Sequence, residues 1–168
     1  AIGPPPSDRR EEAIARLLAC GSTPDHDHAR RFLDFARTHA VNLDHLWCSM
    51  ADDGRFKAVA LAVPNPGRTA MFFASQPHSA EELQRTSEVI DALCLRLAED
   101  GLHLAQTLLD VHDHDSETVF AGARFRRLAT LSYLERPLRS RLVPAPPQWA
   151  DGGRLVTYQP SLRHEFAE

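Results

Sequence analysis

Residues 69–109 read TAMFFASQPHSAEELQRTSEVIDALCLRLAEDGLHLAQTLL, and this stretch decides the fold. The apolar segment 69–75 has the composition of a strand, and Gln-Pro-His follows it as a break. Apolar residues at helical spacing predict a helix over 79–100, and 102–109 has the composition of a second, buried strand. Because a long helix joins the two strands, we expect them to run parallel to each other.

The ends of the predicted helix carry residues that satisfy free backbone groups. Ser79 and Glu82 form a capping box, in which each side chain accepts a hydrogen bond from a backbone N–H at the start of the helix. Gly101 suits the left-handed conformation that commonly ends a helix. Between these ends, the apolar residues that share one face are Leu83, Val89, Ile90, Leu93 and Leu97.

The residues before this unit predict two helices and an antiparallel meander. Helices are expected over 9–20 and 27–38. They follow a Gly/Pro lead-in at 1–6, which we expect to form neither a helix nor a paired strand. Two turn signals, Asp52-Asp53-Gly54 and Asn65-Pro66-Gly67, separate three strands. The expected strands cover 43–50, 56–63 and 69–75.

The residues after the unit predict a short helix over 116–123 and a final strand pair over 125–128 and 129–135. The segment 139–152 is rich in proline and has the composition of a linker. Residues 153–168 predict one more strand and the start of a helix. The order of elements therefore predicts an α+β fold.

This fold has a mixed, mostly antiparallel sheet flanked by helices, and we expect it to occupy residues 7–138. The chain has 168 residues, of which 43% are hydrophobic and 25% charged, which is enough for a buried core. A net charge of -4 argues against nucleic acid or an anionic membrane as a partner. Three cysteines without paired spacing, and no apolar run of about 20 residues, indicate a cytoplasmic protein.

The element order and several motifs resemble the GNAT superfamily of N-acetyltransferases. Residues 67–75 are similar to the family's fourth strand, and the helix and strand that follow match its next two elements. Residues 119–125, Val-Phe-Ala-Gly-Ala-Arg-Phe, align with the helix that bears the family's tyrosine, and 129–136 resemble its last strand. The tail at 153–168 resembles the opening of a second copy of the fold, as in the degenerate N-terminal lobe of a tandem acetyltransferase. Alternatively, the tail supplies the first strand that the chain otherwise lacks.

The resemblance implies acetyl-CoA as cosubstrate. In this fold the fourth and fifth strands separate, and backbone groups between them hold the pantetheine arm. The diphosphate meets backbone amides at the start of the next helix, where N–H groups have no partner inside the helix. The implied cofactor-binding residues are Phe73, Ala74, Ser75, His78, Ser79, Asp113 and Phe120.

Transfer to an amine also needs proton movement, because the amine must lose a proton and the thiolate must gain one. His112 and Asp113, at the end of the second buried strand, are the candidate catalytic residues. Phe120 stands where the family has its acid tyrosine, and Arg124 replaces the family's glycine.

The diphosphate loop departs from the family as well. Residues 76–81, Gln-Pro-His-Ser-Ala-Glu, contain no glycine, and Pro77 has no N–H to donate. Glu81 and Glu82 place two negative charges beside the expected anion, so we expect weak binding of the cofactor.

The sequence thus favours an acyl-CoA-dependent N-acyltransferase, in particular an accessory lobe with impaired catalysis. Its partners would be a small-molecule or peptide amine and either a second GNAT lobe or another copy of the chain. The alternative is a non-catalytic binding or oligomerisation module that kept the fold. Two clusters, Asp25-His26-Asp27-His28 and His112-Asp113-His114-Asp115, have metal-ligand chemistry, but their polar context favours solvated loops and helix starts, so no metal site is predicted.

Overall fold

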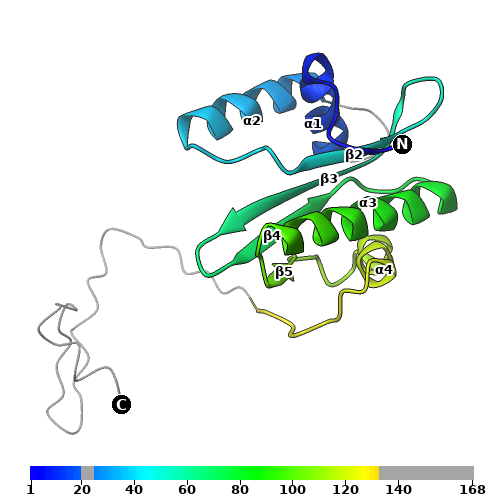
Figure 1. Cartoon of the computed structure of the whole chain (residues 1–168). Helices are drawn as coiled ribbons and strands as arrows, with labels where there is room; N and C mark the ends of the chain where they lie inside the picture. The colour runs from blue at the N-terminus through cyan, green and yellow to red at the C-terminus, as the bar shows by residue number, and fades with distance from the viewer. Residues whose placement is uncertain (20–24, 133–168) are drawn as a thin grey trace, which may run out of the picture. The chain divides into compact units, whose positions relative to one another are not determined.

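A five-stranded sheet forms the centre of the computed structural model, with its strands in the order β1-β2-β3-β4-β5 (Figure 1). The strands are Ile2–Gly3, Leu46–Met50, Phe56–Asn65, Thr69–Ala74 and Leu104–Gln106. Neighbours from β1 to β4 pair antiparallel, and β4 pairs parallel with β5. The predicted α+β class, the meander and the parallel crossover are therefore confirmed.

The structure describes residues 1–19 and 25–132. Almost all of them belong to one compact unit, Ala1–Thr130. The proposed linker at 139–152, the tail at 153–168 and most of the expected strand 129–135 lie outside the described residues. Within the described part of the chain, no helix is both long and apolar enough to cross a membrane.

The helices cover the two faces of the sheet (Figure 1). After a short 3-10 turn at Ser7–Arg9, α1 (Arg10–Leu18) and α2 (His26–Thr38) lie on one face, and α3 (Ala80–Glu99) and α4 (His114–Gly122) lie on the other. Each of these elements differs from its predicted span by only a few residues at either end.

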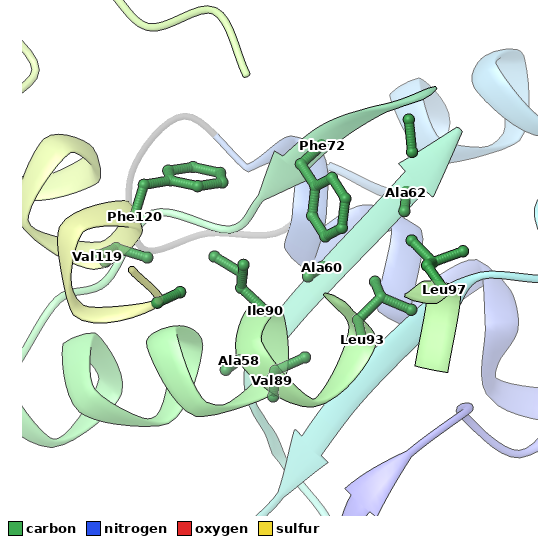
Figure 2. Close-up of a cluster of buried hydrophobic side chains, with 12 residues drawn as sticks. Ala58, Ala60, Ala62, Phe72, Val89, Ile90, Leu93, Leu97, Val119 and Phe120 are labelled. Carbon is green, nitrogen blue, oxygen red and sulfur yellow. The ribbon is translucent and has the colours of Figure 1, made fainter. Parts of the chain in front are cut away.

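Strand β3 belongs to both cores because its side chains alternate between the faces. Val59 and Leu61 pack against α1, whereas Ala58, Ala60 and Ala62 face α3. These small side chains leave room for larger ones from α3, α4 and β4. Figure 2 shows the Phe72 ring of β4 directed toward the α3 side chains in this core.

Two cysteines lie within the described part of the chain. Cys48 is buried in β2, and Cys94 is half-buried on α3. Burial raises the pKa of both thiols to about 11. Both are therefore protonated at neutral pH, which makes them poor nucleophiles.

The lead-in at 1–6 does contain a paired strand, and the expectation that it would not is wrong. Ile2 pairs with Ser49 and Gly3 with Cys48. The prolines begin only at Pro4, so the two residues before them keep the N–H groups that a ladder needs. Two residues of β2 at this edge of the sheet, Cys48 and Ser49, are thus paired with β1.

Two other expectations for strands are wrong. Strand β5 has three residues where 102–109 was expected. Before it, the N–H of His103 donates to Arg68 O at 2.8 Å, and after it the side chain of Thr107, not its backbone, bonds to Phe72 O. No strand forms over residues 125–132. Instead, Arg124 takes a φ of 66° at the end of α4, and the N–H of Phe125 returns to Phe120 O at 2.9 Å. That bond and the one from Arg124 N–H to Ala121 O close the helix in the manner of a Schellman motif.

The left-handed conformation of Arg124 leads to a first prediction. A side chain disfavours this conformation by about 1–2 kcal/mol, a cost that glycine avoids. Both Arg124→Gly and Arg124→Ala remove the exposed ion pair with Asp91, so the two variants differ mainly in this cost. We expect Arg124→Gly to have the higher free energy of unfolding, by about 1 kcal/mol in urea titrations. Equal stabilities would mean that Arg124 does not hold this conformation in solution.

Candidate functional site

Strands β4 and β5 separate part-way along β4. Their pairing joins Thr69 with Leu104, Ala70 with Ala105 and Met71 with Gln106, and then stops. One step further, the Thr107 hydroxyl donates to Phe72 O at 3.1 Å. Beyond Phe72, strand β4 continues to Ala74 without a strand partner among the described residues on that side.

The backbone of Ala74 faces this separation. On the β3 side, the N–H of Ser75 donates to Val59 O at 2.9 Å. Residues of an antiparallel strand turn their N–H and C=O groups alternately to one neighbour and then the other. Ser75 and Phe73 therefore turn toward β3, and Ala74 turns toward the open side. Of the three strand residues that the sequence suggested for pantetheine, only Ala74 presents both backbone groups there.

Ser75 has a structural role at the same point. Its side chain is buried, and its hydroxyl accepts a hydrogen bond from Val59 N–H at 3.0 Å, in place of the ladder bond that ordinary pairing would supply. Sequence reasoning assigned this residue to the cofactor and did not indicate that its hydroxyl belongs to the sheet.

Ser75→Ala should therefore be destabilising although it removes only one oxygen atom. It leaves the buried N–H of Val59 without an acceptor, which costs about 1–3 kcal/mol. Urea unfolding should show this loss. Ser75→Thr keeps the hydroxyl and is the comparison; if both variants lose the same amount, lost volume or crowding rather than the hydrogen bond explains the effect.

The start of α3 is capped by its own side chains. One half of the predicted capping box is confirmed, because the Ser79 hydroxyl accepts from Glu82 N–H at 3.1 Å. The other half differs: the Glu82 carboxylate accepts from the N–H of His78, one residue before the cap, at 2.9 Å. The N–H groups of Ala80 and Glu81 have no hydrogen-bond partner among the described residues. The amides of His78 and Glu82 are thus already in use, and those of Ser79, Ala80 and Glu81 are available.

Arg16 of α1 reaches this helix start, and the sequence analysis did not identify it. Its Nη2 donates to Gln76 O at 2.8 Å and to the Glu82 carboxylate at 3.1 Å. The residue is only 9% exposed, and its Nη1 is buried without a hydrogen-bond partner. The available signal was an arginine inside the apolar segment Ala13–Leu17, where a lone charge requires a buried partner.

The two neighbouring glutamates are in different environments. Glu81 is exposed and forms an ion pair with Lys57, and this hydrogen bond holds the pKa of its carboxyl below the ordinary value. Glu82 points the other way, toward Arg16 and His78. Only Glu82 occupies the place that an anion would take at the helix start.

The remaining predicted residues lie elsewhere in the fold. The Asp113 carboxylate caps α4 by accepting from Ser116 N–H at 3.0 Å. His112 is exposed in the preceding turn, where its N–H donates to Asp110 at 2.8 Å. Phe120 is 3% exposed and packs edge-on against Phe125 in the core. No hydrogen bond or ion pair joins these three residues to Ala74 or to the start of α3.

No group of three or more His, Cys, Asp or Glu side chains that could hold a metal occurs within residues 1–19 and 25–132. In the first His/Asp cluster, Asp25 caps α2 by accepting from His28 N–H at 2.9 Å. His26 lies 3.7 Å from the Glu11 carboxylate.

Two hollows on the described surface lie away from Ala74 and from the start of α3. The larger, about 480 Å³, lies between α1, α2 and residues 41–44. The smaller, about 180 Å³, lies between α3 and β5 beside Phe72 and Cys94.

No family model matches the sequence, and no curated protein matches it significantly. Solved structures do match. A probable acetyltransferase superposes with a TM-score of 0.61 and 10% identity, covering 84% of this chain and 99% of its own. A ribosomal-protein-alanine N-acetyltransferase from Brucella melitensis superposes with a TM-score of 0.56 and 11% identity, and the match covers 77% of this chain and 86% of that protein. An aminoglycoside antibiotic 6'-N-acetyltransferase from Acinetobacter haemolyticus superposes with a TM-score of 0.58 and 8% identity, and the match covers 83% of this chain and 99% of that protein. The chain therefore has the α+β fold of the GNAT acetyltransferases.

Proposed function

We propose that the chain is an acyl-CoA-binding lobe of an N-acyltransferase. The observation that carries the proposal is the separation of β4 from β5 with Ala74 facing it. Pantetheine contains two amides, and each needs a donor and an acceptor when it leaves water. The N–H and C=O of one residue at the separated edge supply that pair without a side chain, so one amide fits here.

The diphosphate end of the cofactor fits less well. Its oxygens need several donors, and the Glu82 carboxylate already takes His78 N–H and one nitrogen of Arg16. The observed arrangement of these groups therefore does not accommodate a diphosphate. Weak binding follows from this mismatch, with dissociation constants of about 0.1–1 mM.

The acceptor under this proposal is an amine, from a small molecule or from a peptide. The names of two structural neighbours cover both classes, an aminoglycoside and a ribosomal-protein alanine. Neither candidate position favours proton transfer. The Asp113 carboxylate caps α4, and Phe120 has no acidic proton to donate. We therefore propose slow or absent transfer by this lobe, with a second lobe or another copy of the chain as partner.

Calorimetric titration with acetyl-CoA tests the binding function. Ala74→Pro removes the Ala74 N–H, which faces the separation, and leaves the hydrogen bonds to β3 in place, as proline does at a strand edge. We expect it to weaken binding about fivefold or more, the size of one lost hydrogen bond. Ala74→Ser keeps the N–H and should bind as the parent does.

A second assay follows CoA release with a panel of amines. Binding with slow or no release supports the accessory lobe. No binding at 5 mM acetyl-CoA, a concentration that should stabilise the fold by about 1 kcal/mol or more if the site exists, would overturn the proposal and favour the non-catalytic module.

A further inference from the structure

The start of α3 is a built anion site that holds an anion from the chain itself. The Glu82 carboxylate accepts from a backbone N–H of His78, at 2.9 Å, and from a guanidinium N–H of Arg16, at 3.1 Å. Unpaired amides and the helix dipole favour negative charge at such a place. A buried arginine adds a full positive charge, which most helix starts do not have.

The guanidinium of Arg16 has a donor nitrogen that this internal anion does not use. Both hydrogen bonds of the guanidinium come from Nη2, while Nη1 is buried and has no partner. Buried donors without an acceptor are rare in native proteins. A guanidinium suits a ligand with several oxygens, such as a phosphate, better than it suits one oxygen of a carboxylate.

Glu82 can leave the site more easily than Arg16. About a quarter of the Glu82 side chain is exposed (26%), against 11% of the Arg16 side chain. If the carboxylate turns into solvent, His78 N–H becomes available beside those of Ala80 and Glu81, and Arg16 keeps its place through Gln76 O. The amide of His78 and the guanidinium of Arg16, which now share this carboxylate, would then both be free for another anion.

We propose that Glu82 is an internal competitor that the diphosphate of an acyl-CoA must displace, and that Arg16 then binds the diphosphate. This rests on the proposed function, because it assumes that the pantetheine arm is placed by Ala74. Under this mechanism Glu82 occupies the site in the free protein. The affinity for an acyl-CoA is weak because the diphosphate must displace Glu82.

Glu82→Gln tests the proposal, with Glu81→Gln as the matched control one position away. The amide keeps an acceptor for His78 N–H but loses the charge that holds it to Arg16. We expect calorimetry in low salt to show CoA binding at least tenfold tighter for Glu82→Gln. Glu81→Gln should gain less than threefold, because its charge is exposed and already paired with Lys57. Arg16→Lys in the Glu82→Gln background should lose most of the gain.

Pantetheine, which lacks the diphosphate, is the second probe. It distinguishes a failure of the displacement proposal from a failure of the proposed function. The parent and both glutamine variants should bind it equally. If the parent binds pantetheine and CoA but Glu82→Gln binds CoA no tighter, the displacement proposal is wrong and the proposed function stands. If no variant binds either probe, the proposed function is wrong and this inference falls with it. Thermal unfolding of each variant without ligand establishes that it is folded.

Discussion

Replacing Phe72 by alanine is expected to lower the free energy of unfolding by about 4 kcal/mol, the usual cost of removing a buried aromatic ring. Phe72 is 1% exposed and meets Phe125 edge-on, with ring centroids 5.7 Å apart. Its other neighbours include the alanines of β3, which are too small to fill the space that the ring would leave (Figure 2). The cavity should therefore persist, and the cost should lie near the upper end for a large-to-small change.

Phe73→Ala is the matched control for this prediction. It removes the same ring one residue further along β4, where alternation places it on the opposite face and 50% exposed. We expect a loss of no more than about 1.5 kcal/mol, because half of the ring already meets water. Urea titrations of both variants measure the difference. Similar losses would show that the two faces of β4 are assigned incorrectly.

The second large effect concerns Arg16 and Glu82. Glu82→Ala is expected to cost about 3 kcal/mol, because it leaves a buried guanidinium without its charged partner and frees the N–H of His78. Arg16→Ala should cost a similar amount, since it also removes the bond to Gln76 O that ties α1 to the segment before α3.

A double-mutant cycle separates the pair from its surroundings. If the two side chains interact as observed, the double variant should lose less than the sum of the single losses, by about 1–3 kcal/mol. Glu81→Ala is the control, and its exposed ion pair should contribute less than about 1 kcal/mol. Losses that simply add would mean that Arg16 and Glu82 do not stabilise each other.

Features that depend on neighbouring residues were predictable from the sequence. The Ser79–Glu82 capping box is such a feature, and so are the turns at 52–54 and 65–67, because each is made by residues a few positions apart. The parallel pairing of β4 and β5 followed from the long helix between them.

Features that depend on distant residues were not predictable. The pairing of Ile2 with Ser49 joins residues far apart in the chain, and two residues carry no strand pattern of their own. The bonds of Arg16 to Gln76 and Glu82 likewise cross 60 or more positions. At Arg124, a non-glycine residue takes the left-handed conformation that usually marks glycine, so the sequence did not show that Phe125 bonds back to the helix and does not begin a strand.

The candidate site was predicted in outline and differs in detail. Phe73, Ala74 and Ser75 share one stretch of strand, and pairing alone decides that Ala74 faces the separation. The two glutamates look alike in the sequence, yet one pairs with Lys57 at the surface and the other with Arg16 inside. Composition cannot distinguish such neighbours, because the difference arises from which way each side chain points in the folded chain.

The most direct test of the account is the response of individual backbone amides to CoA, measured by nuclear magnetic resonance on uniformly labelled protein. We expect the amide signals of Ala74, His78, Ala80 and Glu81 to shift with one common dissociation constant. Pantetheine should shift the signal of Ala74 and leave those of His78 and Glu81 unchanged. Shifts confined to other residues, such as those of the hollow between α1 and α2, with Ala74 unaffected at saturation, would contradict it.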